Sequence, residues 1–117
     1  MPLNVVIDGC STLVEFGTLH PEIRASPAHW MRVTKAANWS SAVDVKASFS
    51  KAKALGGDRV RFEVAGGNYR LIVAFDFARG IAFVKFIGTN AEYDGIDALT
   101  VSKYWEHLNY GNTSDPQ

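Results

Sequence analysis

The chain has 117 residues and 47% of them are hydrophobic, which is enough for one domain with a buried core and excludes intrinsic disorder as a description of the whole chain. Its formal net charge is zero at pH 7, its single cysteine (Cys10) cannot form an internal disulfide, and no apolar run approaches the roughly 20 residues that a membrane span needs. Together with the lack of a signal-peptide pattern, these features predict a cytoplasmic protein that has no membrane partner.

The N-terminal residues predict a strand followed by a short helix. Residues 4–7 form a short apolar run, which we expect to add a strand to a sheet. Thr12 followed by Glu15 three residues later is a capping-box pattern, and apolar side chains then recur at helical spacing. The sequence therefore predicts a helix over residues 12–19.

Two further cap patterns predict two more helices. Ser26 followed by Pro27 has the form of an N-cap with proline at the first helical position, which indicates a helix that runs to about Ala37. Ser41 with Asp44 has the pattern of an N-terminal cap for a third helix.

The stretch from Arg59 to Asp97 predicts three consecutive antiparallel strands. Its first strand, residues 59–64, alternates charged and apolar side chains, so one face is buried and the other is in contact with solvent. The Gly66–Asn68 segment supplies residues that tolerate the positive φ of a tight hairpin. The other predicted strands are residues 69–77, residues 81–88 and, with poorly set boundaries, residues 51–55.

These elements predict an α+β domain. We expect a twisted, mainly antiparallel sheet with N-terminal helices packed on one face and a C-terminal helix over residues 97–108. The opposite face of the sheet should stay open. The domain should cover residues 1–110, and residues 111–117 should form a polar, disordered tail.

The charges are unevenly distributed along the chain. Residues 24–85 carry eleven Lys or Arg against four acids, a net charge of +7, whereas both ends are acidic. A basic patch of this kind can attract phosphates. The alternative is a solvated surface whose sign has no function.

Three motifs in the second half of the chain belong together: GGNYRLIVAFDF, IAFVKFIGT and AEYD, supported upstream by Leu13–Phe16, His20-Pro21, Trp30, Trp39 and residues 43–46. In combination they resemble the HigB-type toxins of the RelE superfamily. The resemblance covers roughly residues 4–104. It implies a RelE-like fold and a metal-independent endoribonuclease, without cofactor, that cleaves messenger RNA on the ribosome by 2′-hydroxyl attack.

The same resemblance implies two kinds of partner. One is a helix-turn-helix antitoxin (HigA-like), through which alone the toxin would meet operator DNA; the other is the ribosome with its messenger RNA. Asn90 stands where the family has a histidine. An alternative function is therefore a catalytically weakened protein that acts as an antitoxin-binding or regulatory module.

The main candidate for the reacting phosphate is Arg70. It interrupts a predicted buried strand, where an unpaired guanidinium is costly, so it needs a carboxylate or a phosphate. RelE-like sequences place an arginine directly after the tyrosine of this strand and use it on the scissile phosphate. The alternative is a structural ion pair with Glu63, Asp76 or Glu92.

Four more residues are candidates for the chemistry. Glu92 is the first candidate for the general base and Glu63 the second. Tyr93 is a candidate to stack on a base or donate a hydrogen bond, with simple packing as the alternative. Asn90 can donate and accept hydrogen bonds but cannot relay protons, so cleavage should be slow if the family histidine is the acid.

Three basic residues are candidates for RNA binding. Arg59 and Arg61 lie on the charged face of the first strand, and Lys85 breaks an otherwise apolar strand. No metal site is expected, because His20, His29 and His107 share no metal-ligand spacing with one another or with the cysteine.

Overall fold

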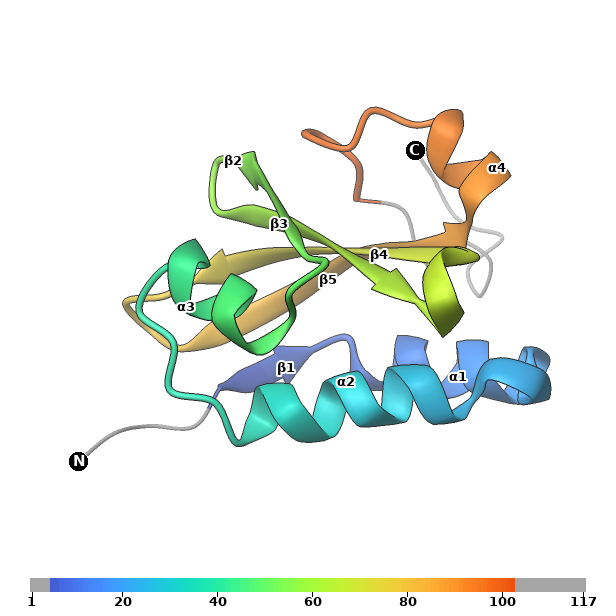
Figure 1. Ribbon diagram of the computed structural model, residues 1–117, viewed down its shortest axis with the longest axis horizontal. Helices are drawn as coiled ribbons and strands as arrows, with labels where there is room; N and C mark the ends of the chain where they lie inside the picture. Colours follow the sequence, from blue (N-terminus) through green and yellow to red (C-terminus); the bar gives the residue numbers. More distant parts are fainter. Residues whose placement is uncertain (1–4, 103–117) are drawn as a thin grey trace.

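The sheet sets the architecture, which a computed structural model describes for residues 5–102. Its strands are β1 (Val6–Asp8), β2 (Lys53–Gly56), β3 (Arg59–Val64), β4 (Tyr69–Asp76) and β5 (Ile81–Thr89). They lie in the order β1-β5-β4-β3-β2, with β1 parallel to β5 and the other neighbours antiparallel (Figure 1). The predicted strands are confirmed, with small shifts at their ends.

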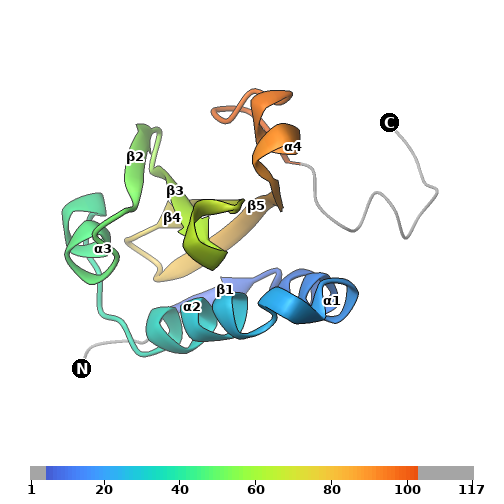
Figure 2. The ribbon, with the colours of Figure 1, turned by 45° about the vertical axis from the view of Figure 1, so that its right-hand side comes forward.

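The helices lie on both sides of this sheet. They are α1 (Cys10–Leu19), α2 (Ala25–Lys35), α3 (Ala42–Ser48) and α4 (Asn90–Asp94), with short 3-10 turns η1 (Pro21–Ile23) and η2 (Ala65–Gly67). Figures 1 and 2 show α1 and α2 against one face, and α4 on the side of the opposite face. The prediction of an α+β fold with a mainly antiparallel sheet is confirmed.

The main core fills the space between the sheet and the N-terminal helices. The alternation predicted for β3 is confirmed, because Val60, Phe62 and Val64 are buried. The Phe62 ring meets Trp30 of α2 edge to face, with 5.4 Å between the ring centroids. Burial of these side chains leaves Arg59, Arg61 and Glu63 on the other face of the strand.

The first helix begins earlier than the sequence predicts. Gly9 is the N-cap and α1 starts at Cys10, so the predicted cap at Thr12 is wrong and Thr12 lies buried inside the helix. Gly9 has φ 110°, and a Cβ at this position would lie 2.8 Å from the Cβ of Val84. The helix starts here because only glycine fits a sharp left-handed turn packed this closely on β5.

The second helix also begins upstream of its predicted cap. α2 starts at Ala25 with Arg24 as N-cap, so the prediction of Ser26 as N-cap is wrong. The η1 turn leads almost directly into this helix and sets its start. Pro27 lies in the first turn, where a missing backbone N–H costs no helical hydrogen bond.

The third helix has the predicted N-cap with a different hydrogen bond. Ser41 is the N-cap of α3, but its side chain makes no cap hydrogen bond. Instead, the Asp44 carboxylate accepts hydrogen bonds of 2.9 Å from both the backbone N–H and the hydroxyl of Ser40. These hydrogen bonds lower the pKa of Asp44.

The face opposite the helices is partly covered, so the expectation of a fully open face is wrong. Ile72 and Phe86 on this face are buried in a second apolar cluster with Val101, and Leu55, Tyr93, Ile96 and Ala98 pack against it. We call residues 93–101 the C-terminal segment. The hairpin end of the face, around Glu63 and Arg70, lies outside this cluster.

Arg59 fastens the C-terminal segment to the sheet. Its Nη1 donates hydrogen bonds to the carbonyl oxygens of Ala98 at 3.0 Å and Val101 at 2.8 Å. Both acceptors come from a segment that has no strand partner of its own. The guanidinium therefore replaces the backbone hydrogen bonds that a strand would have made.

We expect Arg59→Ala to lower the free energy of unfolding by about 2 kcal/mol, because two carbonyl groups lose a charged donor. Equilibrium unfolding in urea would measure this loss. Arg32→Ala, which removes an exposed arginine from α2, serves as the control and should change stability by less than about 0.5 kcal/mol. Equal effects of the two substitutions would contradict the role of Arg59.

The last helix within the described residues is α4, which ends before the predicted helix over residues 97–108 begins. Residues 97–102 form turns and irregular backbone, including an Asx turn in which the Asp97 carboxylate accepts a 3.0 Å hydrogen bond from the N–H of Leu99, so this part of the prediction is wrong. The rest of the predicted range, 103–108, and the tail, 111–117, lie outside the described residues. Within residues 5–102, every helix is too short or too polar to cross a bilayer.

Candidate functional site

The centre of the candidate site is Arg70 on β4. It lies directly opposite Glu63 on β3 and Gly88 on β5, and is partly buried. Its Nη1 donates a 2.6 Å hydrogen bond to the carbonyl of Gly67 in the β3–β4 hairpin. In the described part of the chain it forms no ion pair within 4 Å. Its other N–H groups are thus available to an anion.

Asn90 reaches the same carbonyl from the start of α4. Its Nδ2 donates to the Gly67 carbonyl at 2.9 Å, and its backbone N–H donates to the carbonyl of Asn68 at 3.3 Å. Arg70 and Asn90 therefore converge on one oxygen. The shared Gly67 carbonyl joins α4 to the hairpin, and its hydrogen bond with Arg70 Nη1 fixes the position of the guanidinium.

Glu92 lies in helix α4. Its carboxylate accepts a 2.8 Å hydrogen bond from the backbone N–H of Thr89, while the Thr89 hydroxyl accepts one of 3.1 Å from the N–H of Glu92. This reciprocal pair is a capping box that starts α4. The pattern Thr-x-x-Glu was visible in the sequence but was not used.

The capping box brings the Glu92 carboxylate against the sheet beside Arg70. A Cβ at Gly88 would lie 2.5 Å from Glu92 Oε1 and 2.8 Å from the Phe86 ring. Only glycine allows this approach, because a side chain would displace both groups. Gly88 is the cross-strand neighbour of Arg70, so Glu92 borders the site.

Glu63 borders the site from the opposite side. A Cβ at Gly67 would lie 3.2 Å from Glu63 Oε1 and 3.7 Å from Arg70 Nη1. Both groups thus lie over the same turn. Among residues 5–102, no hydrogen bond or ion pair occupies the Glu63 carboxylate, unlike that of Glu92.

Arg61 and Tyr93 form a pair next to this centre. The guanidinium carbon of Arg61 lies 5.7 Å from the centroid of the Tyr93 ring, within the range of a cation–π contact. Tyr93 also packs against the apolar cluster of the C-terminal segment. The Arg61 Nε is buried without a hydrogen-bond partner in the described structure.

Lys85 lies apart from Arg70. It occupies the irregularity of β5 between the pairs Ile72–Phe86 and Val73–Val84, and its Nζ lies 5.5 Å from the centroid of the Phe83 ring. It lies three positions before Gly88, or about 10 Å along the strand. The guanidinium of Arg59 is hydrogen-bonded to the C-terminal segment, so Arg59 is not part of the site.

Asp76 and Tyr69, at the two ends of β4, have partners outside the site. Asp76 pairs with Arg79 at 2.7 Å, and the hydrogen bonds from Arg79 lower the pKa of Asp76. Tyr69 lies on the helix side, where its hydroxyl donates a 3.5 Å hydrogen bond to the Glu22 carboxylate. Burial, and after it the negative charge of Glu22 and this hydrogen bond, raise the pKa of the Tyr69 phenol. Asp76 is therefore not the partner of Arg70, and Tyr69 stays protonated near neutral pH.

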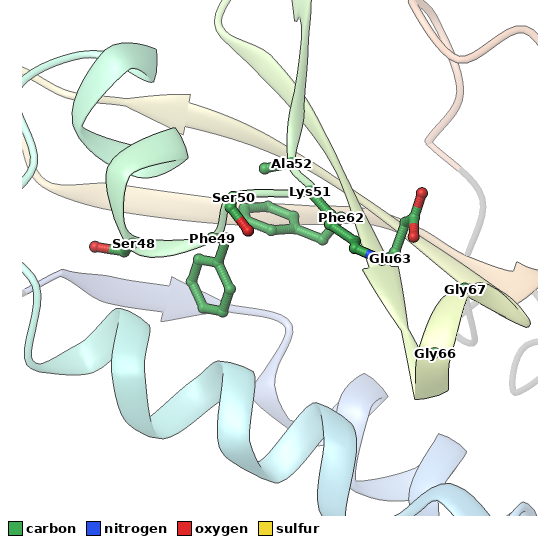
Figure 3. A pocket seen from close by; sticks show the side chains of 9 residues that line it. All are labelled: Ser48, Phe49, Ser50, Lys51, Ala52, Phe62, Glu63, Gly66 and Gly67. Carbon is green, nitrogen blue, oxygen red and sulfur yellow. The ribbon is translucent and has the colours of Figure 1, made fainter.

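A pocket of about 420 Å³ adjoins the site on the β2 side (Figure 3). It lies between residues 48–52 and the end of β3 with its hairpin, Phe62–Gly67. Figure 3 shows the Phe49 ring turned toward the helices and the Glu63 carboxylate turned away from them. The pocket shares Glu63 and Gly67 with the Arg70 site.

Two basic residues on this side were not identified from the sequence. Lys53 on β2 lies directly opposite Arg61 on β3, and Lys51 precedes it by two residues; both are exposed. In the strand predicted over residues 51–55 this spacing puts two side chains on one face, although β2 begins at Lys53 and Lys51 lies in the turn before it. That spacing was the available signal.

No cluster of three or more His, Cys, Asp or Glu side chains suited to a metal ion occurs within residues 5–102. The groups at the site are the side chains described above. They supply a cation, two carboxylates and an amide around one hairpin turn.

Comparison with known proteins identifies the family of the chain. A search of curated proteins found no match. Residues 24–96, which include α2, the last four strands and α4, match a family model described as the HigB toxin, RelE-like toxic component of a toxin-antitoxin system. The chain therefore belongs to the HigB toxin family of toxin-antitoxin systems, whose members have an antitoxin as partner.

Proposed function

We propose that this toxin is a ribosome-dependent endoribonuclease that cleaves messenger RNA at the Arg70 centre. The observation that supports it is the convergence of Arg70 and Asn90 on the Gly67 carbonyl, flanked by Glu63 and Glu92. A cation with free N–H groups can bind a phosphodiester, and a neighbouring carboxylate can accept a proton. These are the two requirements of metal-independent RNA cleavage.

In the proposed reaction Glu63 takes the proton from the 2′-hydroxyl of the substrate. The 2′-oxygen then forms a bond to phosphorus, and the bond from phosphorus to the 5′-oxygen breaks. The leaving oxygen takes a proton from water, because the amide of Asn90 cannot supply one. Arg70 stabilises the charge that grows on the phosphoryl oxygens.

Glu63 suits the role of general base better than Glu92 does. Glu92 already accepts the hydrogen bond that caps α4, and its loss from the cap would loosen the helix that carries Asn90. Glu63 has no such task in the described structure. Tyr93 and Arg61 would support a nucleotide beside the reacting phosphate, and Lys85 would contact RNA further along the sheet.

The partners follow from this proposal. The RNA is presented by the ribosome, which places the reaction in the cytoplasm, and no cofactor takes part. The antitoxin would be a HigA-like helix-turn-helix protein, and the toxin would reach operator DNA only within that complex. Docking of the antitoxin near the hairpin end would block the Arg70 site.

A second function is an antitoxin-binding or regulatory module with weak catalysis. Two observations favour it: Asn90 holds the hairpin where the family has a histidine, and Glu92 is committed to the capping box. Both residues then serve structure, which leaves no side-chain acid for the leaving oxygen.

The reaction product tests the proposed function. We expect purified toxin to cut messenger RNA in a programmed ribosome, in the presence of EDTA, and to leave a 2′,3′-cyclic phosphate, because the attacking group belongs to the substrate itself. Mass spectrometry of the 5′ fragment would identify this end. A 3′-hydroxyl end, or cleavage that EDTA abolishes, would contradict the proposed chemistry.

Asn90→His separates the two functions. If the site is catalytic and lacks only a proton donor, the histidine should raise the cleavage rate by about 10- to 100-fold, with a new dependence on pH near 6.5. Single-turnover cleavage between pH 5 and 8 would measure both changes. Asn90→Ala is the control, since it removes the amide and supplies no acid. No cleavage by either the natural protein or the histidine variant would favour the binding module.

A further inference from the structure

The β2 edge of the sheet carries exposed cations that the reaction itself does not use. Lys53 is paired with Arg61 across β2 and β3, so the two side chains lie on the same face. Lys51 lies two residues before Lys53, and both lysines are exposed. Neither forms an ion pair within 4 Å in the described part of the chain.

The pocket connects Lys51 to the hairpin residues beside Arg70. Lys51, Glu63 and Gly67 all line it, and Gly67 carries the carbonyl to which Arg70 is anchored. From β4 across β3 to β2 the distance is about 10 Å at the usual strand spacing, which a short stretch of single-stranded RNA can span. Partly buried Arg70 and Arg61 and the two exposed lysines therefore lie between β4 and the β2 edge, with Glu63 as the one acid beside them.

The other side of Arg70 is less suited to a phosphate chain. The cross-strand neighbour there is Gly88, over which the Glu92 carboxylate lies. Asp94 follows in the same short helix and is exposed. A negatively charged backbone would be repelled on this side, whereas on the β2 side it meets two lysines and one acid, Glu63.

We propose that the RNA strand leaves the Arg70 centre over the β2 edge and that Lys51 and Lys53 bind its flanking phosphates. This inference rests on the proposed function, because it extends the substrate path of the same site. The ligand is the phosphodiester backbone of single-stranded RNA. Its recognition is by charge, so it should not depend on base sequence.

The salt dependence of RNA binding tests the path without any cleavage. A short, fluorescent, 2′-O-methylated RNA lacks the attacking hydroxyl and reports binding by anisotropy. We expect Lys51→Gln/Lys53→Gln to reduce the slope of log K against log salt by about 0.7 per lost phosphate contact, or about 1.4 for both. Arg32→Gln/Lys35→Gln, which removes two exposed cations from α2, should leave the slope unchanged.

Three results would overturn the proposed path. The first is an unchanged slope in the lysine variant, and the second is an equal fall in the α2 control. The third is normal binding of the RNA combined with weaker binding to ribosomes that carry no message, which would assign the lysines to ribosomal RNA. A fall in slope confined to the lysine variant supports the path.

Failure of the proposed function would look different. If Arg70→Ala cleaved ribosome-bound messenger RNA as fast as the natural protein, the catalytic assignment would fail. The anisotropy measurement would still test RNA binding by the lysines. If Arg70→Ala were inactive and Lys51→Gln/Lys53→Gln kept both its salt slope and its KM, only the path would fail. A raised KM with little change in kcat for Lys51→Gln/Lys53→Gln agrees with both the proposed function and the proposed RNA path.

Discussion

Arg70→Ala is expected to slow cleavage of ribosome-bound messenger RNA by about 10²–10³-fold. The guanidinium is held on the Gly67 carbonyl by one nitrogen and keeps its other N–H groups for the phosphate, so its removal takes away charge stabilisation that is already in place. Single-turnover kinetics with saturating ribosomes would measure the chemical step. Induced expression of the variant without antitoxin should no longer arrest growth.

Arg79→Ala is the matched control for this substitution. Arg79 lies just beyond the other end of the same strand and pairs with Asp76, 70% of its side chain is exposed, and it has no part in the site. The Arg79→Ala variant should cleave messenger RNA at nearly the rate of the natural protein. Equal losses for the two arginines would indicate a general effect of charge, and natural activity of Arg70→Ala would contradict the assignment of Arg70.

Glu63→Gln is expected to lower the rate of cleavage by about 10²–10⁴-fold, because the amide keeps the shape of the side chain but cannot accept a proton. The loss should appear in kcat and leave KM nearly unchanged, since the carboxylate acts on the hydroxyl and not on the phosphate. Rates measured on ribosomes programmed with one defined codon would separate the two constants.

Glu92→Gln distinguishes the two candidate bases. It removes a charged acceptor from the capping box, so we expect about 1 kcal/mol of lost stability and a modest loss of rate. The opposite order, with Glu92→Gln far slower than Glu63→Gln, would assign the base to Glu92.

The strands could be predicted because their signals are local. The alternation of β3 and the hairpin after it follow from neighbouring residues, and the structure has both where the sequence indicates them. The start of α1 could not be predicted in this way. It depends on the contact of Gly9 with Val84, which is 75 positions away in the sequence.

The packing of the C-terminal segment on the second face of the sheet could not be predicted from the sequence either. Residues 97–108 have the pattern of a helix, and nothing in residues 93–101 marks them as the partner of Ile72 and Phe86. Arg59 has the pattern of an exposed strand arginine, yet it holds this segment through two carbonyl groups. Contacts between distant residues decide such features, and one sequence does not contain them.

The same division holds for the candidate site. The sequence named Glu63 as a possible partner of Arg70, and the register places the two residues opposite each other, although no ion pair within 4 Å joins them in the described structure. It did not predict that Asn90 and Arg70 meet on one carbonyl, because that contact depends on how α4 turns back over the hairpin. Helix α4 itself was missed although its capping box was present.

The most direct test of the site is to see where the substrate phosphate lies. Cryo-electron microscopy of the toxin on a ribosome programmed with 2′-O-methylated messenger RNA would trap the complex before cleavage. We predict the scissile phosphate within hydrogen-bond distance of Arg70, with Glu63 beside the methylated 2′-oxygen. Messenger RNA bound to another face of the toxin, with Arg70 still held only by the hairpin, would contradict the account.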